Sequence, residues 1–437
     1  MTRLKIDHIN SFQIFQIFKF GSSLLISIAL AKSYLSLFDI GVFESFIFFS
    51  SSISFFWITG ISQGLLASYT GSINHENHNK ALFFSTFLLM ITFSVLSVIT
   101  FCTVYLIDLP FVSHSIVGQD FLLFLLYILL NPSTFLIEFI LLLEKKFNVL
   151  LIYGILTIII PLFVISIAAF NLLSVSWCFY GLIFWSILKF IYLINLILKY
   201  SRIKFSQHQI SQLFKLSSPL IITSLLVGSA AYIDSLIISF NYDRDTFVIF
   251  RYGAREFPLF LLIANAFGTS MIPQFANSRD LKKNLDEIKT KSKRMIQFFF
   301  PFSMVLLLSS EYIFTLVFSQ NFEMSHRVFD IYLLLIISRF IFPQTILMGL
   351  KRSVSILKIS FLELIVNIIA SLILIQYFGY LGVAYGTVIA YFFEKIMLVI
   401  TIRKKIQIMP IEYIATRELV IYSSILIAIF IVKNCLI

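Results

Sequence analysis

The sequence predicts an integral membrane protein made almost entirely of transmembrane α-helices. Of its 437 residues, 59% are hydrophobic and only 13% are charged, and the mean hydropathy is +0.96. Soluble domains carry about 25% charged residues. A helix needs roughly 20 apolar residues to cross a hydrocarbon core about 30 Å thick, and stretches of this length recur along the whole chain. Lipid, and not water, is therefore expected to surround most of the surface.

Hydropathy divides the chain into about thirteen spans. Six of them precede a polar stretch, at residues 12–36, 40–67, 81–107, 121–143, 150–170 and 175–198. Six more follow it, at residues 213–240, 246–275, 295–318, 328–350, 356–377 and 381–402. Residues 413–432 form one additional apolar stretch near the C-terminus.

The basic residues support this division and predict the orientation of the chain. If alternate loops are taken as cytoplasmic, they hold 22 of the 33 Lys and Arg residues, and the opposite loops hold Arg244, Arg327 and Lys433. Cytoplasmic loops carry the excess of Lys and Arg in multi-pass proteins. The N-terminus is therefore predicted to be cytoplasmic. A net charge of +11 then marks one side of a membrane and gives no reason to expect a nucleic-acid partner.

The two groups of six spans begin alike, which predicts a duplicated architecture. FKFGSSLLIS at residues 18–27 is echoed by FKLSSPLIIT at residues 214–223. Internal repeats of this kind build the two lobes of many transporters, with the substrate site at their interface. We therefore expect an N-lobe at residues 1–199, a cytoplasmic linker at 200–212, a C-lobe at 213–402 and an additional helix at 413–433. Residues 277–294 form the most basic connection, which is typical of an amphipathic helix on anionic headgroups.

Three arginines in the predicted C-lobe lie within apolar spans. A charge at the centre of a bilayer costs about 2.5–3.5 kcal/mol on insertion scales, so such side chains usually face a bundle interior or a wet cavity. Arg251 and Arg255 are four residues apart, which would place both on one helix face, and Pro258 follows at once. Pro343 lies near Arg339 in the same way, and Pro219 interrupts the seventh span.

Two buried acids are the expected charge partners of these arginines, namely Asp234 and Glu256. One interpretation is that all of these charges form closed structural ion pairs. The arginines nevertheless outnumber the two acids, which leaves surplus positive charge. A diphosphate group could satisfy such a surplus, because guanidinium groups bind phosphate in a bidentate manner.

Lysines at the ends of spans are weaker candidates for the same site. Lys19 and Lys215 are predicted in the first turns of their helices, where a long side chain can carry its ammonium group to the headgroups. Lys32 lies in the turn after the first span. Several glutamates also fall in spans, and they include Glu138, Glu363 and Glu394. The sequence does not place these glutamates relative to a cavity.

No motif for catalysis, nucleotide binding or metal binding is present. The chain lacks GxxxxGK[ST], HExxH and CxxC, and its three cysteines have no paired spacing. We therefore expect no catalytic residue, no metal site and no ATP-driven step within this chain.

Four segments resemble the polysaccharide exporters of the multidrug/oligosaccharidyl-lipid/polysaccharide (MOP) superfamily, and in particular the O-antigen flippases called Wzx. LAKSYLSLFDIGVFES at residues 30–45 is similar to the family's turn between its first two helices, where a basic residue such as Lys32 is common. Residues 232–276 resemble its helices seven and eight. Residues 346–360 resemble the loop after helix ten, and residues 378–395 resemble the start of helix twelve.

This resemblance implies a MATE-like fold of two pseudo-symmetric six-helix lobes around a central cavity. It also implies a flippase, and not an enzyme, that moves an undecaprenyl-diphosphate-linked O-antigen or capsule repeat unit to the outer leaflet of a bacterial cytoplasmic membrane by alternating access. Helices one, two, seven, eight and ten would line the cavity, which nominates Arg251, Arg255 and Arg339. Lipids and other glycan-assembly proteins would be its partners. No cofactor is implied, and the membrane potential, H⁺ or Na⁺ could drive the cycle.

Two other functions are compatible with a polytopic chain. A multidrug or toxin extruder of the same fold would need an acidic cavity for cationic drugs, which surplus arginine disfavours. A polytopic O-antigen polymerase or ligase would be expected to carry a sizeable outer loop, and the predicted outer loops are short.

Overall fold

The computed structural model describes residues 8–69, 76–107, 119–171, 174–203, 205–256, 258–277, 281–350 and 352–436. Within these ranges the chain forms α-helices and short 3-10 helices joined by turns, with no strand. Packing divides it into two compact units, Met1–Gly228 and Ser229–Ile437. The predicted all-α fold is confirmed.

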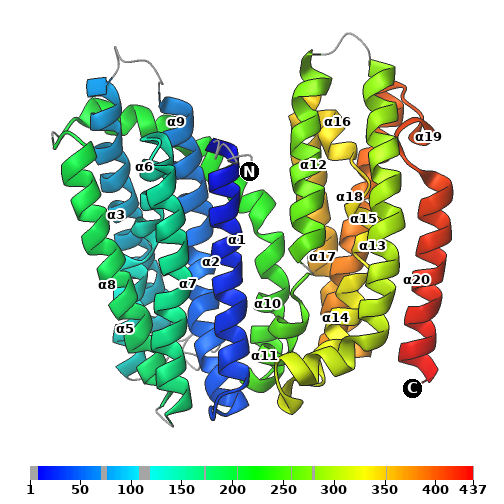
Figure 1. Cartoon of the computed structure of the whole chain (residues 1–437), viewed down its shortest axis with the longest axis horizontal. Coiled ribbons are helices and arrows are strands. Elements are labelled where there is room, and N and C mark those ends of the chain that lie inside the picture. Colours follow the sequence, from blue (N-terminus) through cyan, green and yellow to red (C-terminus); the bar gives the residue numbers. More distant parts are fainter. Residues whose placement is uncertain are drawn as a thin grey trace, which may run out of the picture. The chain divides into compact units, whose positions relative to one another are not determined.

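The first unit is a bundle of long helices, coloured blue to green in Figure 1. Within it α1 packs on α7, and α2 packs on α9. The fourth predicted span consists of α5, η2 and α6, which follow one another through a 3-10 turn at Pro132. The elements are α1 (His8–Ala31), α2 (Leu37–Ser68), α3 (Glu76–Leu106), α5 (Gln119–Leu130), η2 (Pro132–Phe135), α6 (Leu136–Leu143), α7 (Phe147–Phe170), α8 (Val175–Tyr200) and α9 (Gln207–Gly228).

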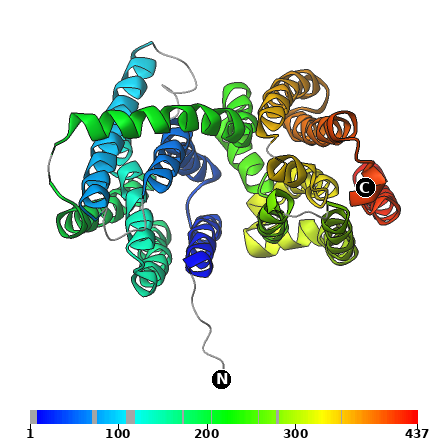
Figure 2. The ribbon, with the colours of Figure 1, turned by 90° about the horizontal axis from the view of Figure 1, so that it is seen from above.

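The second unit contains more interrupted helices. Seen from above in Figure 2, its orange helices α17 and α18 lie side by side, and they pack along their length. The elements are α10 (Ala230–Asn241), α11 (Arg244–Gly253), α12 (Pro258–Asn277), α13 (Leu281–Val317), η3 (Gln320–Phe322), α14 (Ser325–Leu333), α15 (Ile336–Arg339), α16 (Pro343–Gly349), α17 (Ser353–Phe378), α18 (Tyr380–Ile406), α19 (Pro410–Tyr413) and α20 (Thr416–Leu436).

Nine helices within the described ranges are long and apolar enough to cross a bilayer. A tenth span is obtained if Ser325–Arg339 and Pro343–Gly349, which are bent by 44° relative to each other, are counted together. The other predicted spans are also helical, and they correspond to α9–α12 and α20. The chain is therefore a multi-pass membrane protein.

Of the three prolines considered above, two interrupt their predicted spans. Pro258 and Pro343 each begin a new helix, because proline disfavours the helical conformation of the residue before it. Pro219 differs from the prediction, since α9 continues through it without a break. Pro219 has no backbone N–H to donate to the carbonyl of Lys215. This carbonyl instead accepts a hydrogen bond from the Ser218 hydroxyl at 3.4 Å. The seventh predicted span is instead interrupted after Gly228.

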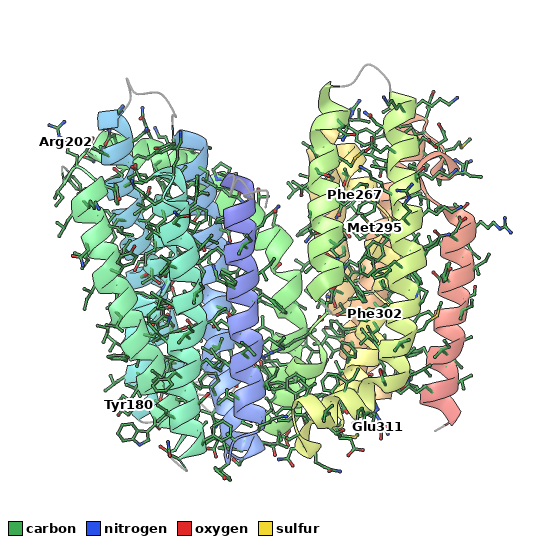
Figure 3. All side chains as sticks on the ribbon, in the orientation of Figure 1. Tyr180, Arg202, Phe267, Met295, Phe302 and Glu311 are labelled. Atoms are coloured by element: carbon green, nitrogen blue, oxygen red, sulfur yellow. The ribbon has the colours of Figure 1, made fainter. Side chains whose placement is uncertain are left out.

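From Leu281 onward, the basic segment and the ninth predicted span form one helix, α13, of 37 residues; residues 278–280 lie outside the described ranges. At 1.5 Å per residue it is about 55 Å long, which exceeds a hydrocarbon core of about 30 Å. Figure 3 places Met295, Phe302 and Glu311 in that order along it. One face exposes large apolar side chains at helical spacing, as a lipid-facing helix requires, namely Phe298, Phe302, Val305, Leu308, Tyr312 and Leu316.

Helix α9 packs on α2 through two glycines that allow close approach. A Cβ atom on Gly60 would lie 2.5 Å from the backbone nitrogen of Ile221, and one on Gly64 would lie 2.0 Å from the Ser217 hydroxyl. Small residues let membrane helices approach in this way. The division by packing therefore differs from the predicted lobe boundary at residues 200–212, because α9 belongs to the first unit.

A tight hairpin joins α17 to α18 in the second unit. Gly379 connects them with φ +59°, a left-handed conformation that glycine adopts without steric cost. A Cβ on Gly382 would lie 2.2 Å from the Leu374 carbonyl, and one on Gly386 would lie 2.7 Å from the Ser371 nitrogen. This close approach brings the inward faces of the two helices together.

Candidate functional site

Asp234 of α10 lies in a cluster of hydrogen-bond donors inside the second unit, and it is 6% exposed. Its Oδ2 accepts hydrogen bonds from the Tyr332 hydroxyl and, at 2.5 Å, from the Thr387 hydroxyl. Its Oδ1 accepts one from the Asn367 amide at 3.2 Å. The sequence predicted an arginine partner for Asp234, whereas three uncharged side chains surround its carboxyl group. Short protic side chains thus replace the expected ion pair.

Arg339 forms the ion pair that the sequence predicted for Glu256. Its Nε donates to Glu256 Oε2 at 2.9 Å, and its Nη2 donates to Glu256 Oε1. The guanidinium group also lies over the ring of Tyr391, with its Cζ 4.5 Å from the ring centroid. Both side chains are largely buried. This bidentate geometry makes the pair a strong one. Glu256 accepts from the two N–H donors of Arg339 that a phosphate would otherwise use.

A second group of charges lies between α16 and α18. The Gln344 amide donates to Glu394 Oε1 at 2.6 Å, and its carbonyl oxygen accepts a hydrogen bond from Lys395 Nζ at 3.1 Å. Lys395 Nζ also lies 3.5 Å from Glu394 Oε2. Both charged residues are buried. Gln344 connects the two charges and keeps both away from lipid.

Glu363 of α17 belongs to the same buried region. It is 5% exposed, and its Oε1 has no hydrogen-bond partner among the described residues. Glu394, Asp234, Lys395 and Arg339 are the charged groups close enough to act on it electrostatically. The two charge groups and the Asp234 cluster are therefore parts of one buried network.

This network was not predicted, although buried polar residues recur at helical spacing in the sequence. Ser360, Glu363, Asn367 and Ser371 follow one another at spacings of three or four residues, and all four are buried. Thr387 and Glu394 lie on the inward face of the facing helix. Such spacings place side chains on one face of a helix. A polar stripe within a membrane span was the available signal.

Arg251 and Arg255 are not one helical turn apart on a common face. Helix α11 ends at Gly253, and Arg255 lies in the interruption before α12. The Arg251 guanidinium lies 5.7 Å from the centroid of the Phe247 ring, and that of Arg255 lies 4.9 Å from that of Tyr252. The predicted helical pair is wrong because α11 ends too early. Both side chains are partly exposed beside the N-terminal end of α12.

An acid fixes the other end of α11. Asp243 is the N-cap, and its carboxylate accepts a hydrogen bond from the Thr246 backbone N–H at 2.9 Å. The hydrogen bonds from Thr246 hold the pKa of Asp243 below its ordinary value. The cap therefore keeps its charge at neutral pH and fixes the start of the helix that carries Arg251.

The predicted surplus of positive charge is smaller than the sequence indicated. The prediction set the three arginines against Asp234 and Glu256 alone. The structure adds Glu363 and Glu394 to the buried acids, with Lys395 as the added base. The surplus of bases over acids in this group is thereby removed. A role of Arg251 and Arg255 in binding an anion remains a prediction.

Lysines and a glutamate form a smaller buried group in the first unit. Lys19 Nζ lies 3.1 Å from Glu138 Oε2 and 4.3 Å from the centroid of the Phe135 ring. Lys189 Nζ donates to Asn131 Oδ1 at 2.5 Å. Helix α1 begins at His8, so Lys19 lies well inside it and not in its first turn. The ion pair explains how a helix interior accommodates this lysine.

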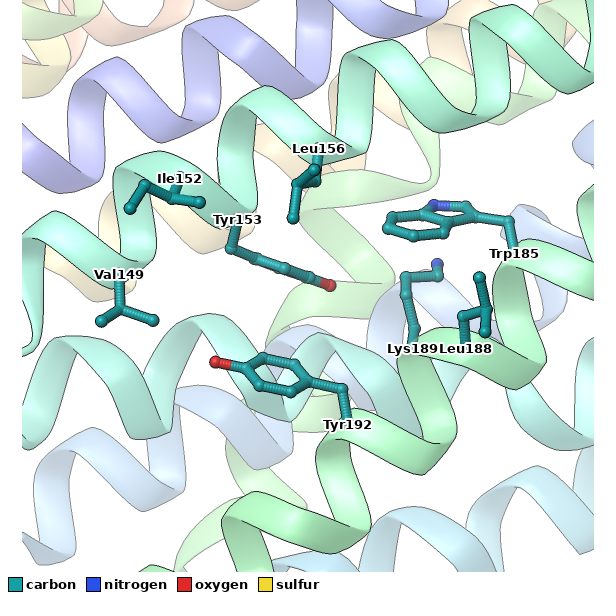
Figure 4. Close-up of a pocket in the computed structure, with 8 residues that line it drawn as sticks. All are labelled: Val149, Ile152, Tyr153, Leu156, Trp185, Leu188, Lys189 and Tyr192. Atoms are coloured by element: carbon teal, nitrogen blue, oxygen red, sulfur yellow. The ribbon is translucent and has the colours of Figure 1, made fainter.

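Lys189 also lines a cavity of about 220 Å³ between α7 and α8 (Figure 4). In the close-up its ammonium nitrogen lies beside Trp185, whose ring centroid is 5.9 Å away. Apolar side chains and the tyrosines Tyr153 and Tyr192 form the rest of the lining. The cavity is mostly apolar, and Lys189 is its one charged lining residue.

The two remaining candidate lysines are exposed. Lys32 lies in the turn after α1, and Lys215 lies eight residues after the start of α9 and not in its first turn. The structure of the first unit therefore leaves both ammonium groups accessible. Their role in substrate binding remains a prediction.

A family model described as polysaccharide biosynthesis protein matches residues 33–327, which is more than half of the chain. The chain belongs to this family. The matched range contains Asp234, Arg251, Arg255 and Glu256. Arg339 and the polar residues of α17 and α18 lie beyond it. No curated protein matches the chain.

Solved structures of transporters share the fold of this family member. The lipid II flippase MurJ in an inward closed conformation is 18% identical, with a TM-score of 0.68 over 97% of this chain and 92% of that one. A multidrug resistance MATE family transporter of the MOP superfamily is 14% identical, with a TM-score of 0.63 inward-facing and 0.56 outward-facing. These matches cover 89% and 92% of this chain and 94% and 95% of those structures. The predicted MATE-like fold is confirmed.

Proposed function

We propose that this protein is a flippase that moves an undecaprenyl-diphosphate-linked oligosaccharide, such as an O-antigen or capsule repeat unit, from the inner to the outer leaflet of a bacterial cytoplasmic membrane. One observation carries the proposal, namely that a chain of a polysaccharide biosynthesis family has the fold of MOP transporters. In bacteria, a transporter in polysaccharide assembly needs a cargo that carries sugar and can enter from lipid. A prenyl diphosphate-linked glycan meets both requirements.

The interruption between α11 and α12 supports an anionic cargo. Arg251 and Arg255 are partly exposed there, and the N-terminal end of the 20-residue helix α12 follows. Free backbone N–H groups and the helix dipole favour negative charge at such an end. In transporters, the N-termini of interrupted helices commonly face anionic groups of the substrate. We propose that this arrangement binds the diphosphate.

The membrane potential could drive the transfer without ATP. Moving one charge across 100 mV changes the free energy by about 2.3 kcal/mol, so the outward movement of two negative charges gains about 4–5 kcal/mol. Alternating access by relative movement of the two lobes is the transport mode that we propose, with the N-terminus on the cytoplasmic side. Other glycan-assembly proteins are the expected partners.

A multidrug extruder is the second candidate, and one observation favours it. Asp234 has neutral hydrogen-bond donors and Glu363 Oε1 has none among the described residues, so these two buried acids of the second unit have no ion-pair partner within 4 Å there. Acidic side chains of this kind suit a cationic drug. Drug susceptibility of a strain that lacks the gene separates the two functions. The flippase predicts unchanged susceptibility to cationic drugs and a loss of surface glycan.

Arg255→Ala tests the flippase directly. We expect transport of the lipid-linked glycan to fall about 10- to 100-fold, because a charge-assisted hydrogen bond contributes about 1.5–3 kcal/mol. The measurement is surface glycan in a strain whose only copy carries the variant, together with the amount of lipid-linked precursor on the inner leaflet. The amount of protein in the membrane should not change.

Arg327→Ala is the matched control, because Arg327 is an exposed arginine of the same unit. It should leave surface glycan at the level of the unsubstituted protein. Normal glycan in Arg255→Ala would remove Arg255 from the site, and equal losses in both variants would point to a general effect of charge.

A further inference from the structure

Glu363 has a buried carboxyl oxygen that the anion-binding role does not use. The residue is 5% exposed, and its Oε1 lacks a hydrogen-bond donor among the residues that the structure describes. An ionised carboxylate without a donor is costly in a region of low dielectric constant, whereas a neutral carboxyl group is tolerated there. The surroundings of Glu363 therefore favour a carboxyl group that carries a proton.

The neighbours of Glu363 already have partners of their own. Glu394 and Lys395 of α18 are held by each other and by Gln344, and Arg339 of α15 is held by Glu256. These two cations therefore have nearer acceptors than Glu363. The other titratable groups that face the network are Asp234 of α10, Tyr332 of α14 and Tyr391 of α18.

Protic side chains follow Glu363 on the same face of α17. Asn367 follows one turn later and donates to Asp234, and the Ser371 hydroxyl contacts Asn367 Oδ1 at 3.0 Å. The Thr387 hydroxyl reaches Asp234 from the facing helix. From Glu363 to Ser371 the helix rises about 12 Å, which is a large part of a hydrocarbon core about 30 Å thick.

We propose that Glu363 is the proton-binding group of this lobe, and that its protonation is coupled to the movement of the lipid-linked glycan. In one conformation the carboxylate takes up one H⁺ from water on one side of the membrane and becomes neutral. In the other conformation it releases that H⁺ to water on the opposite side, and no further reactant is needed. The coupling rests on the flippase function proposed above, whereas proton binding by Glu363 does not.

Infrared difference spectroscopy of the full-length protein in liposomes tests proton binding without a glycan. Protons alone are the probe, and pH is changed at constant salt. The C=O stretch of a neutral carboxyl group is separate from the carboxylate stretches, so titration of one buried carboxyl group gives a difference band. We expect Glu363→Gln to lose the intensity of one carboxyl group and Glu363→Asp to keep a shifted band. Glu311→Gln, at an exposed glutamate of α13, should change nothing.

The outcomes separate this proposal from the flippase function. A band that survives in Glu363→Gln, or one that responds to Na⁺ at constant pH, overturns the proton site. If the band is lost but glycan export by Glu363→Gln keeps the pH dependence of the unsubstituted protein, the coupling is overturned. Normal glycan in Arg255→Ala would count against the proposed diphosphate site and leave the infrared result standing.

Discussion

Arg339 shows how the buried network accommodates a charge in a membrane protein. Its guanidinium group donates to the Glu256 carboxylate and lies over the ring of Tyr391. A buried pair of this kind contributes little relative to apolar residues of the same shape, but removal of one partner leaves an uncompensated charge. Arg339 and Glu256 are therefore expected to depend on each other for stability.

A double-mutant cycle measures this dependence. Arg339→Ala and Glu256→Ala should each lower the free energy of unfolding by about 3–5 kcal/mol, because each leaves the other charge buried. The double variant should lose less than the sum of the two, with a coupling energy of about 0.5–3 kcal/mol. Thermal unfolding of the detergent-solubilised protein gives the three values. Additive losses would show that Glu256 does not need Arg339.

Residue chemistry alone predicted an arginine partner for Glu256, but not which of the three arginines, and it did not predict the surroundings of Asp234. Opposite charges buried in one apolar region must pair, so few kinds of partner were available to Glu256. Asp234 is satisfied by a hydroxyl of Thr387 and an amide of Asn367, which come from distant parts of the sequence. Neutral side chains of this kind occur throughout the chain, so their convergence depends on packing that composition does not show.

The α17–α18 hairpin positions most of the polar network. Its two helices approach closely because Gly382 and Gly386 present no side chain to the facing backbone. The hydroxyls of Ser371 and Thr387 both donate hydrogen bonds to the Val383 carbonyl, and the bond from Ser371 depends on this close approach. The hairpin is therefore expected to be sensitive to added volume.

Gly382→Ala tests this dependence. Its Cβ would lie 2.2 Å from the backbone oxygen of Leu374, so the helices must separate, and we expect a loss of about 1–3 kcal/mol in the free energy of unfolding. Gly21→Ala is the control, because nothing lies within 4 Å of a Cβ placed there. That variant should be unchanged or stabilised by up to about 1 kcal/mol, as expected for alanine in a helix. Equal thermal stability of the two variants would contradict the close packing.

At the scale of elements, the sequence predicted where helices occur but not where each helix is interrupted. Apolar length predicted nearly every span, since the bilayer sets that length. Proline marked the interruptions at Pro258 and Pro343, yet α9 continues through Pro219, where the Ser218 hydroxyl donates to the carbonyl that the proline leaves free. The early end of α11 at Gly253 separates two arginines that the sequence placed on one face.

For the whole molecule, the distribution of basic residues predicts which ends of the helices face the cytoplasm. The connections at Lys145 and Arg202 of the first unit carry basic residues, and the connection between α7 and α8 carries none. The positive-inside rule connects this asymmetry to orientation. The prediction concerns the membrane, and it can be tested without knowledge of the cargo.

Cysteine labelling of intact cells provides that test. In a background in which the native cysteines are replaced, Ser174→Cys in the turn before α8 should react with a membrane-impermeant maleimide. Ser206→Cys, before α9, should react only after the membrane is permeabilised. Reversed reactivity of the two positions would invert the proposed orientation.

The packing of α9 on α2 has a consequence for biosynthesis. The surface around Gly60 and Gly64 is completed by residues that are translated some 150 positions later, at Ser217 and Ile221. The nascent first six spans would therefore enter the bilayer with a gap along α2, which lipid or a translocase component has to occupy until α9 emerges from the ribosome. Maturation of the first half of the molecule thus waits for the start of the second.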